Sequence, residues 1–251
     1  MSDYSSVADL YDTYVTETGD LAFWSGFAAV APGPILELGA GTGRATVALR
    51  AASTRAVVAL DLAPEMLRRL LLRFRNATGG VWAVGGDMTK LPFRAERFGL
   101  VVIPFNSLGE VVEASKRAAV IRELRRVLVP DGRAVITLHN PACRRQTLDA
   151  QVHQLGRFAL DRTQLEVLVR GRLISDNIAE SEQTYRVLDS RNHVLEERRL
   201  TLRFALPDAA SLTAMARDAG MELQAIYGDY DQTQYMPDSS RFILAVMRRT
   251  T

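Results

Sequence analysis

The 251-residue sequence contains little cysteine and little lysine, and each shortage excludes a kind of site. Its one cysteine, Cys143, allows neither an internal disulfide nor a cysteine-based metal cluster. No lysine occurs before position 90, so a phosphate-binding loop of the NTPase type, which ends in Gly-Lys, is excluded from the first 89 residues. An HExxH pattern is missing, and His139, His153 and His193 share no ligand spacing, so we expect no bound metal ion.

Long apolar runs and a strong net charge are also missing. The longest apolar stretches, such as 57–60 and 100–105, are strand-length, whereas a membrane helix needs about 18–20 residues. The 31 basic and 29 acidic residues nearly balance, and the arginines between 68 and 75 fit a solvated helix face better than a nucleic-acid surface. The N-terminus lacks a basic-then-apolar signal pattern. We therefore expect a cytoplasmic protein that binds neither membranes nor nucleic acids.

Short apolar runs alternate with amphipathic stretches through the first 140 residues. The pattern predicts strands at 35–38, 56–60, 81–84, 98–103 and 133–138. Helices are expected at 42–51, from Pro64 onward, and at 115–128. This alternation predicts an α/β fold, a Rossmann-like and mostly parallel sheet with helices on both faces. A helix at 208–219 and strands at 221–227 and 241–246 bring the expected sheet to seven strands.

The pattern changes after Pro141. Three extended runs, separated by turn-like residues, indicate an antiparallel meander inserted after the fifth strand, at 165–174, 180–188 and 194–206. We expect three parts: a helical cap or lid at 1–30, a core at 31–140 and 208–251, and a substrate-side subdomain at 141–207. The meander also offers a surface for a homodimer.

The loop after the first strand, Glu-Leu-Gly-Ala-Gly-Thr-Gly at 37–43, is the most informative segment. Glycine at such a strand-to-helix turn permits positive φ and close approach of a ligand to the backbone. A dinucleotide fingerprint, GxGxxG, would place its third glycine at position 44, where Arg44 stands. Asp61, at the end of the second strand, can accept hydrogen bonds from both ribose hydroxyls of an adenosine cofactor. That role suits NAD equally well. Only the glycine spacing therefore distinguishes NAD from another adenosine cofactor.

Four motifs in this order resemble the class I S-adenosylmethionine-dependent methyltransferases. They are the glycine loop through Arg44, Asp61, Gly86-Asp87-Met88, and the segment 125–133 before the fifth strand. The resemblance covers most of the chain and implies S-adenosylmethionine as cofactor and S-adenosylhomocysteine as product. The cofactor-binding residues that it implies are Glu37, Gly39, Ala40, Gly41, Arg44, Asp61, Leu62, Asp87, Met88 and Phe105.

The resemblance also implies individual roles for these residues. Asp87 accepts the adenine amino group, and Leu62 and Met88 sandwich the ring. Glu37 and a backbone carbonyl near Phe105 bind the ammonium group. Arg44 has two interpretations, a residue that binds the cofactor carboxylate or an ordinary residue on a helix surface.

Methyl transfer requires the nucleophile, the methyl carbon and the sulfur in line, with water excluded. His139, directly after the fifth strand, is the candidate general base, and a structural histidine is the alternative. Tyr11 resembles the tyrosine that closes the site in many small-molecule methyltransferases and is the second catalytic candidate. Four further candidates face the acceptor, although packing or capping explains them as well: Tyr14, Asn106, Tyr230 and Tyr235.

Strand four is followed by Pro-Phe-Asn-Ser, so the Asp/Asn-Pro-Pro-Tyr tetrapeptide of enzymes that methylate amino groups of bases or glutamine is absent. The chain most resembles glycine/sarcosine and amino-sugar N-methyltransferases of bacterial pathways. We expect methyl transfer to the nitrogen, or the oxygen, of a small metabolite in bacterial specialised metabolism. Two alternatives remain open, an enzyme of the same fold that performs cyclisation and a regulatory module that only binds the cofactor.

Overall fold

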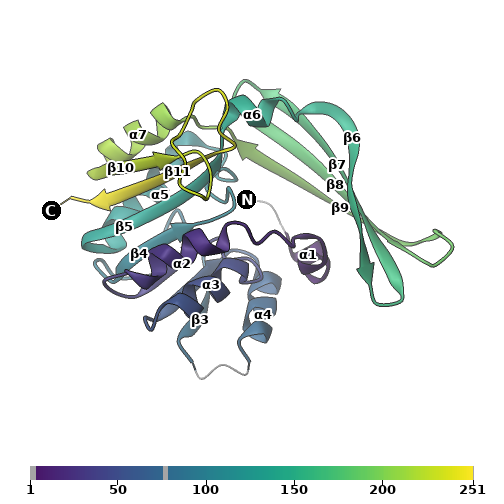
Figure 1. Ribbon diagram of the computed structural model, residues 1–251, viewed down its shortest axis with the longest axis horizontal. Helices are drawn as coiled ribbons and strands as arrows, with labels where there is room; N and C mark the ends of the chain where they lie inside the picture. The colour runs from purple at the N-terminus through teal and green to yellow at the C-terminus, as the bar shows by residue number, and fades with distance from the viewer. Residues whose placement is uncertain (1–3, 76–78, 251) are drawn as a thin grey trace.

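A seven-stranded sheet forms the centre of the computed structural model, which describes residues 4–75 and 79–250 (Figure 1). The strand order is β10-β11-β5-β4-β1-β2-β3. The strands are β1 Ile35–Leu38, β2 Val57–Asp61, β3 Val81–Gly85, β4 Phe98–Ile103, β5 Leu128–His139, β10 Met221–Tyr227 and β11 Phe242–Arg249. β11 runs antiparallel to β5 and β10, and the pairs from β5 to β3 are parallel. The expected Rossmann-like α/β fold is confirmed.

Helices cover both faces because successive residues of a strand point to opposite sides. In β1, Leu36 packs with α5 (Ala114–Val127) and α7 (Ala209–Asp218) on one face. Ile35 packs with α2 (Leu21–Ala29) and α3 (Arg44–Ala52) on the other face. The crossover helix α4 (Pro64–Arg73) buries Leu67 and Leu70 beside β2. The apolar strands are therefore covered on both sides, as parallel sheets require.

The insertion after β5 forms a separate antiparallel sheet, which projects from the core in Figure 1. Its strands, in spatial order, are β6 Asp149–Leu160, β7 Thr163–Ser175, β8 Ile178–Leu188 and β9 Val194–Ala205. The sequence predicted three extended runs, and this number was wrong because β6 was missed. β6 is an edge strand whose first seven residues are all exposed, so no alternation of apolar and polar residues marks it.

Two other differences from the predicted boundaries have a clear cause. β5 starts at Leu128, directly after α5, and not at residue 133, because the strand continues through an irregular segment: Asp131 has a φ of +60°, and the register against β4 shifts between Phe98 and Leu100. α3 starts at Arg44, since the preceding Gly43 has a φ of +88° and its left-handed conformation ends the loop two residues later than expected.

The N-terminal segment packs in two places. Val7, in the short helix η1 (Tyr4–Val7), and Leu10, in α1 (Ala8–Tyr14), pack against buried residues of the inserted sheet. Trp24 of α2 packs instead against the main sheet. Figure 1 shows α1 between the core and the inserted sheet, where it contacts α4, β6 and β7. In the described part of the chain, no helix combines the length and the apolar character that crossing a membrane requires.

Candidate active site

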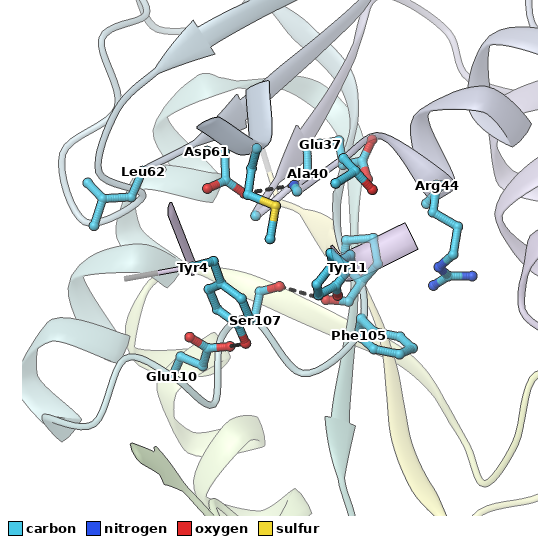
Figure 2. Close-up of a pocket in the computed structure, with 16 residues that line it drawn as sticks. Tyr4, Tyr11, Glu37, Ala40, Arg44, Asp61, Leu62, Phe105, Ser107 and Glu110 are labelled. Carbon is cyan, nitrogen blue, oxygen red and sulfur yellow. Dashed lines mark hydrogen bonds between the residues drawn. The ribbon is translucent and has the colours of Figure 1, made fainter. Parts of the chain in front are cut away.

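A cavity lies at the carboxyl edge of the main sheet, where β1, β2 and β4 end (Figure 2). Open α/β sheets bind ligands at this edge. The loop after β1 forms its floor. Asp61, which ends β2, and Leu62 lie on one side, and Phe105 and Ser107, which follow β4, lie on the other. We refer to it as the cofactor cavity.

The glycine loop needs glycine for two different reasons. Gly39 and Gly41 have φ angles of +69° and +55°, which residues with a side chain rarely adopt. A Cβ atom at Gly39 would lie 2.6 Å from the Oγ atom of Ser107, so the close approach of the two loops requires glycine there. A Cβ at Gly41 would meet no atom within 4 Å. Gly41, with Ala40 beside it, lines the cavity and leaves space for a ligand.

Asp61 connects the loop after β1 to the loop after β2. Its carboxylate accepts hydrogen bonds from the amide of Gly41 at 2.7 Å and from the amide of Ala63 at 2.9 Å. Burial raises the pKa of Asp61, and the backbone amides act in the opposite direction. Because each carboxylate oxygen has two lone pairs, Asp61 can still accept hydroxyl groups of a ribose.

Glu37 is a buried carboxyl group on the wall of the cofactor cavity, with 1% of its surface exposed. Burial raises its pKa to about 8, although a 2.5 Å hydrogen bond from Thr46 and the positive charge of Arg44 both lower it. A carboxyl group in this state is well suited to a cationic ligand, because an ammonium group would stabilise its ionised form. The site thus fits the expected S-adenosylmethionine, and binding of the ribose by Asp61 and of the ammonium group by Glu37 stays a prediction.

Arg44 also lines the cofactor cavity, but its guanidinium group is engaged within the protein. It forms a two-point ion pair with Asp20, 2.7 Å in the Nη2–Oδ2 contact, and lies 4.8 Å from the ring centroid of Phe105. Asp20 is also fixed by the indole N–H of Trp24. Arg44 therefore fastens α2 to the site, and its contact with a cofactor carboxylate stays a prediction.

Asp87 and Met88 are not among the residues that line the cofactor cavity. Asp87 is exposed and accepts the amide of Thr89 at 2.8 Å. Met88 is fully buried, and its Cε atom lies 3.8 Å from the position of a Cβ at Gly39. Of the two residues expected to sandwich adenine, Leu62 lines the cavity, whereas Met88 supports the glycine loop from behind.

The N-terminal segment forms a roof that the sequence did not predict in full. The Tyr4 hydroxyl donates a 2.7 Å hydrogen bond to Glu110, and its ring meets that of the expected Tyr11 edge-on at 6.0 Å (Figure 2). The spacing of seven residues between the two tyrosines, two helical turns, was the signal available in the sequence. Under this roof the cofactor cavity holds about 80 Å³, less than the roughly 300 Å³ at which ligand pockets begin. We therefore expect the roof to shift when a cofactor binds.

A second, larger cavity of about 610 Å³ adjoins the first and shares Tyr4, Tyr11, Phe105 and Glu110 with it. Two expected residues, His139 and Asn106, lie in its wall, and the Asn106 side chain accepts the His139 amide at 3.1 Å. We refer to it as the acceptor cavity.

The His139 ring lies between aromatic side chains, stacked on Phe242 at 5.9 Å and tilted against Phe204 at 6.4 Å. Burial lowers its pKa to about 4, and the nearby charges of Arg144 and Arg241 act in the same direction. His139 is therefore neutral at pH 7 and a weak base.

The aromatic candidates for acceptor contacts divide into two groups. Tyr14 and Tyr230 line the acceptor cavity, and the Tyr14 hydroxyl is 2.9 Å from that of Tyr185 in the inserted sheet. Tyr235 lines neither cavity and packs against the main core. Sequence reasoning missed Arg144 and Ser181, which line the acceptor cavity from α6 (Pro141–Arg145) and β8. Within residues 4–75 and 79–250, no three His, Cys, Asp or Glu side chains gather to hold a metal ion.

Residues 35–132 match the family described as a methyltransferase domain. A demethylmenaquinone methyltransferase from Clavibacter sepedonicus is 44% identical over 111 residues, which are 43% of this chain and 42% of that protein. The chain spans about half the length of the first curated relatives that it matches.

Solved structures share the fold along the whole chain. An S-adenosylmethionine-dependent methyltransferase from Clostridium acetobutylicum has a TM-score of 0.82 at 15% identity, with 99% of each chain covered. A sugar N-methyltransferase from Streptoalloteichus sp has a TM-score of 0.78 at 18% identity, with 98% of this chain and 93% of that chain covered. Identities this low show a common fold alone.

The fold and the glycine loop together are those of an α/β protein with a cavity at the carboxyl edge of its main sheet. Residues 35–132 thus match a methyltransferase domain, and the chain as a whole shares the fold of a solved S-adenosylmethionine-dependent methyltransferase.

Proposed function

We propose that this chain transfers the methyl group of S-adenosylmethionine to a nitrogen atom of a small bacterial metabolite, in specialised metabolism. The observation that carries the proposal is the junction of the two cavities. Tyr4, Tyr11, Phe105 and Glu110 line both, so a cofactor in one and an acceptor in the other would meet at these side chains. In-line displacement requires this end-to-end arrangement.

Residues in different parts of the two cavities have different roles in this proposal. When bound, S-adenosylmethionine supplies an electrophilic methyl group. Asp61 and Glu37, in the wall of the cofactor cavity, would bind the ribose and the ammonium group of the cofactor. The roof made by Tyr4 and Tyr11 would exclude water from the junction. Asn106 fixes the backbone at His139 and so shapes the acceptor side.

Nitrogen is favoured over oxygen because neither catalytic candidate, His139 or Tyr11, is a strong base. The pKa of His139 is lowered to about 4, and burial raises the pKa of Tyr11 so that its hydroxyl stays protonated. An uncharged amine can attack without a base, whereas a hydroxyl group benefits from one. The similar fold of a sugar N-methyltransferase agrees with this choice. Transfer to oxygen, with His139 as base, is the second candidate.

The first experiment measures thermal unfolding with S-adenosylmethionine, S-adenosylhomocysteine or NAD. A ligand at 100 times its dissociation constant adds about 2.7 kcal/mol, hence roughly 5–10 °C for a chain of this size. We expect this shift with both adenosyl compounds, and its loss in Asp61→Ala. A shift with NAD alone would contradict the proposal.

The second experiment follows products from a panel of small amines and matched alcohols. Methyl transfer predicts S-adenosylhomocysteine in equal amount to a methylated product, from amines in preference to alcohols. Cyclisation without transfer would give a product and no S-adenosylhomocysteine. Cofactor binding without turnover of any compound would favour a regulatory module.

A further inference from the structure

Arg144 stands out among the charged residues of the acceptor cavity. It lies in α6, directly after β5, and its guanidinium group is 5.2 Å from the ring centroid of Phe204. Its Nη1 atom donates to the hydroxyl of Thr147 at 2.8 Å, whereas its Nε atom is buried without a hydrogen-bond partner. Burial lowers the pKa of Arg144. The structure thus holds a partly buried cation that hydrogen-bonds a neutral hydroxyl.

A second polar atom in the wall of the same cavity lacks a partner. Ser181 is 2% exposed, and its hydroxyl oxygen is buried without a hydrogen bond. Buried polar groups in folded proteins are nearly always hydrogen-bonded, and an unsatisfied one costs about 1–3 kcal/mol. Two such groups, the Nε atom of Arg144 and the hydroxyl of Ser181, therefore belong to residues that line one cavity, and they point to a polar ligand.

The acidic residues of the acceptor cavity already have other contacts. Asp20 pairs with Arg44, and Glu110 accepts the Tyr4 hydroxyl. Asp229 lies 4.0 Å from Arg241 and accepts the amide of Tyr230. The carboxylates of the remaining two acidic residues, Glu17 and Asp231, accept hydrogen bonds from backbone amides. In the described residues, none of these five carboxylates forms an ion pair with Arg144, so its charge is available to a ligand.

The backbone around Arg144 is held in place by side-chain contacts. Asn140, at the start of α6, donates to the carbonyls of Pro237 and Ser240 at 2.8 and 2.7 Å and accepts the amide of Ala142 at 3.3 Å. Arg144 in turn donates its amide to the Asn140 carbonyl at 2.9 Å. A cation on a fixed helix is preorganised for binding, which lowers the entropy lost when a ligand is held.

We propose that Arg144, with Ser181, binds an anionic group of the methyl acceptor, a carboxylate or a phosphate, at the end of the acceptor cavity formed by α6 and β8. The proposal rests on the proposed function, in which this cavity holds the acceptor. Arginine presents planar N–H donors that match both anions, and a serine hydroxyl adds one more donor. With the methylated nitrogen at the junction beside Tyr4 and Tyr11, the acceptor is an amine that also carries an acidic group.

The test measures binding by calorimetry with saturating S-adenosylhomocysteine. The three probes share a ring and an amine and differ in one group: p-aminobenzoate, p-aminophenyl phosphate and p-aminobenzamide. We expect at least one anion to bind wild-type protein about 10-fold or more tightly than the neutral amide, since charge-assisted hydrogen bonds contribute roughly 1.5–3 kcal/mol. The anion that binds more tightly identifies the acidic group as carboxylate or phosphate.

The variants assign the preference to Arg144. R144Q should bind the anions and the amide within about 2-fold of each other, and Ser181→Ala should reduce the preference in part. R145Q is the matched control, because Arg145 is exposed on the same helix, lines neither cavity, and should keep the full preference. The affinity of R144Q for S-adenosylhomocysteine should stay unchanged, since Arg144 does not line the cofactor cavity. If R144Q does not fold, the preference for the anions over the amide is compared between wild-type protein and Ser181→Ala.

Three results would overturn the proposal: wild-type protein binds the amide as tightly as the anions, R144Q retains the preference, or no anion binds while S-adenosylhomocysteine does. These results leave the proposed methyl transfer intact. Failure of S-adenosylhomocysteine itself to bind would reject the proposed function, and the assignment of Arg144 would fall with it.

Discussion

The carboxylate of Asp61, at the end of β2, accepts a hydrogen bond of 2.7 Å from the amide of Gly41, in the turn after β1. A second bond of 2.9 Å, from the amide of Ala63, fixes the same carboxylate to its own loop. The residue expected to hold the ribose therefore also shapes the glycine loop without a ligand. Removal of this side chain should affect both stability and cofactor binding.

The stability of the cofactor-free protein should fall in Asp61→Asn. Asparagine has one carbonyl oxygen in place of two carboxylate oxygens, so one buried backbone amide loses its acceptor, at a cost of about 1–3 kcal/mol. Urea unfolding without ligand measures this loss. The matched control is Asp87→Asn, because Asp87 is exposed and accepts a single amide in its own turn, and its change should stay within about 0.5 kcal/mol. Equal losses in the two variants would contradict the role given to Asp61.

Binding of S-adenosylhomocysteine at pH 7 should release a proton from Glu37. Burial raises the pKa of this carboxyl group to about 8, so the free protein holds it mostly protonated at neutral pH. An ammonium group beside it favours the ionised form, and up to about one proton is released per ligand bound. Calorimetry in buffers of different ionisation enthalpy counts the protons. Glu37→Gln should release fewer protons by that amount, and equal release in both proteins would show that the ammonium group binds elsewhere.

Cofactor association should be faster in Tyr4→Phe. The Tyr4 hydroxyl holds the roof to Glu110 with a 2.7 Å hydrogen bond, and the space beneath holds only about 80 Å³. Loss of a bond worth about 0.5–1.5 kcal/mol should raise the association rate roughly 2- to 10-fold, where opening of the roof limits binding. Stopped-flow measurement with S-adenosylhomocysteine tests this. Tyr14→Phe removes a hydroxyl contact to Tyr185 outside the cofactor cavity and should leave the rate unchanged.

Acid should destabilise wild-type protein more than His139→Gln. The pKa of His139 is lowered to about 4, mainly by burial, whereas that of an exposed histidine is about 6.5. Between these values the unfolded chain binds the proton and the folded chain does not, so stability falls as the pH falls. From pH 7 to pH 5 this one group should remove about 2 kcal/mol from the free energy of unfolding.

Urea titrations at the two pH values measure the difference between His139→Gln and wild type. If His139→Gln lost stability in acid as strongly as wild type, the buried neutral state of His139 would be rejected.

The main sheet could be predicted from the sequence because its strands are short apolar runs with clear ends. Strands 35–38 and 98–103 were predicted with the residues that the structure gives, since every residue in both is buried. β6 carries no such pattern, because an exposed edge strand is held by backbone pairing with β7. β6 forms because it pairs with β7, and its own side chains did not predict it.

The residues on the cofactor side of the site could also be predicted from the sequence, because they lie at the ends of predicted strands. The glycine loop directly follows β1 and Asp61 ends β2, and parallel strands bring their carboxyl ends to one edge. The acceptor side is different, since Tyr4, Arg144 and Ser181 come from the N-terminus, α6 and the inserted sheet. From the sequence alone, short-range patterns predicted the fold class, and the family resemblance carried by the glycine loop and Asp61 implied the cofactor. Only the tertiary structure decided which polar groups surround the acceptor, because the packing of distant segments brings these groups to one cavity.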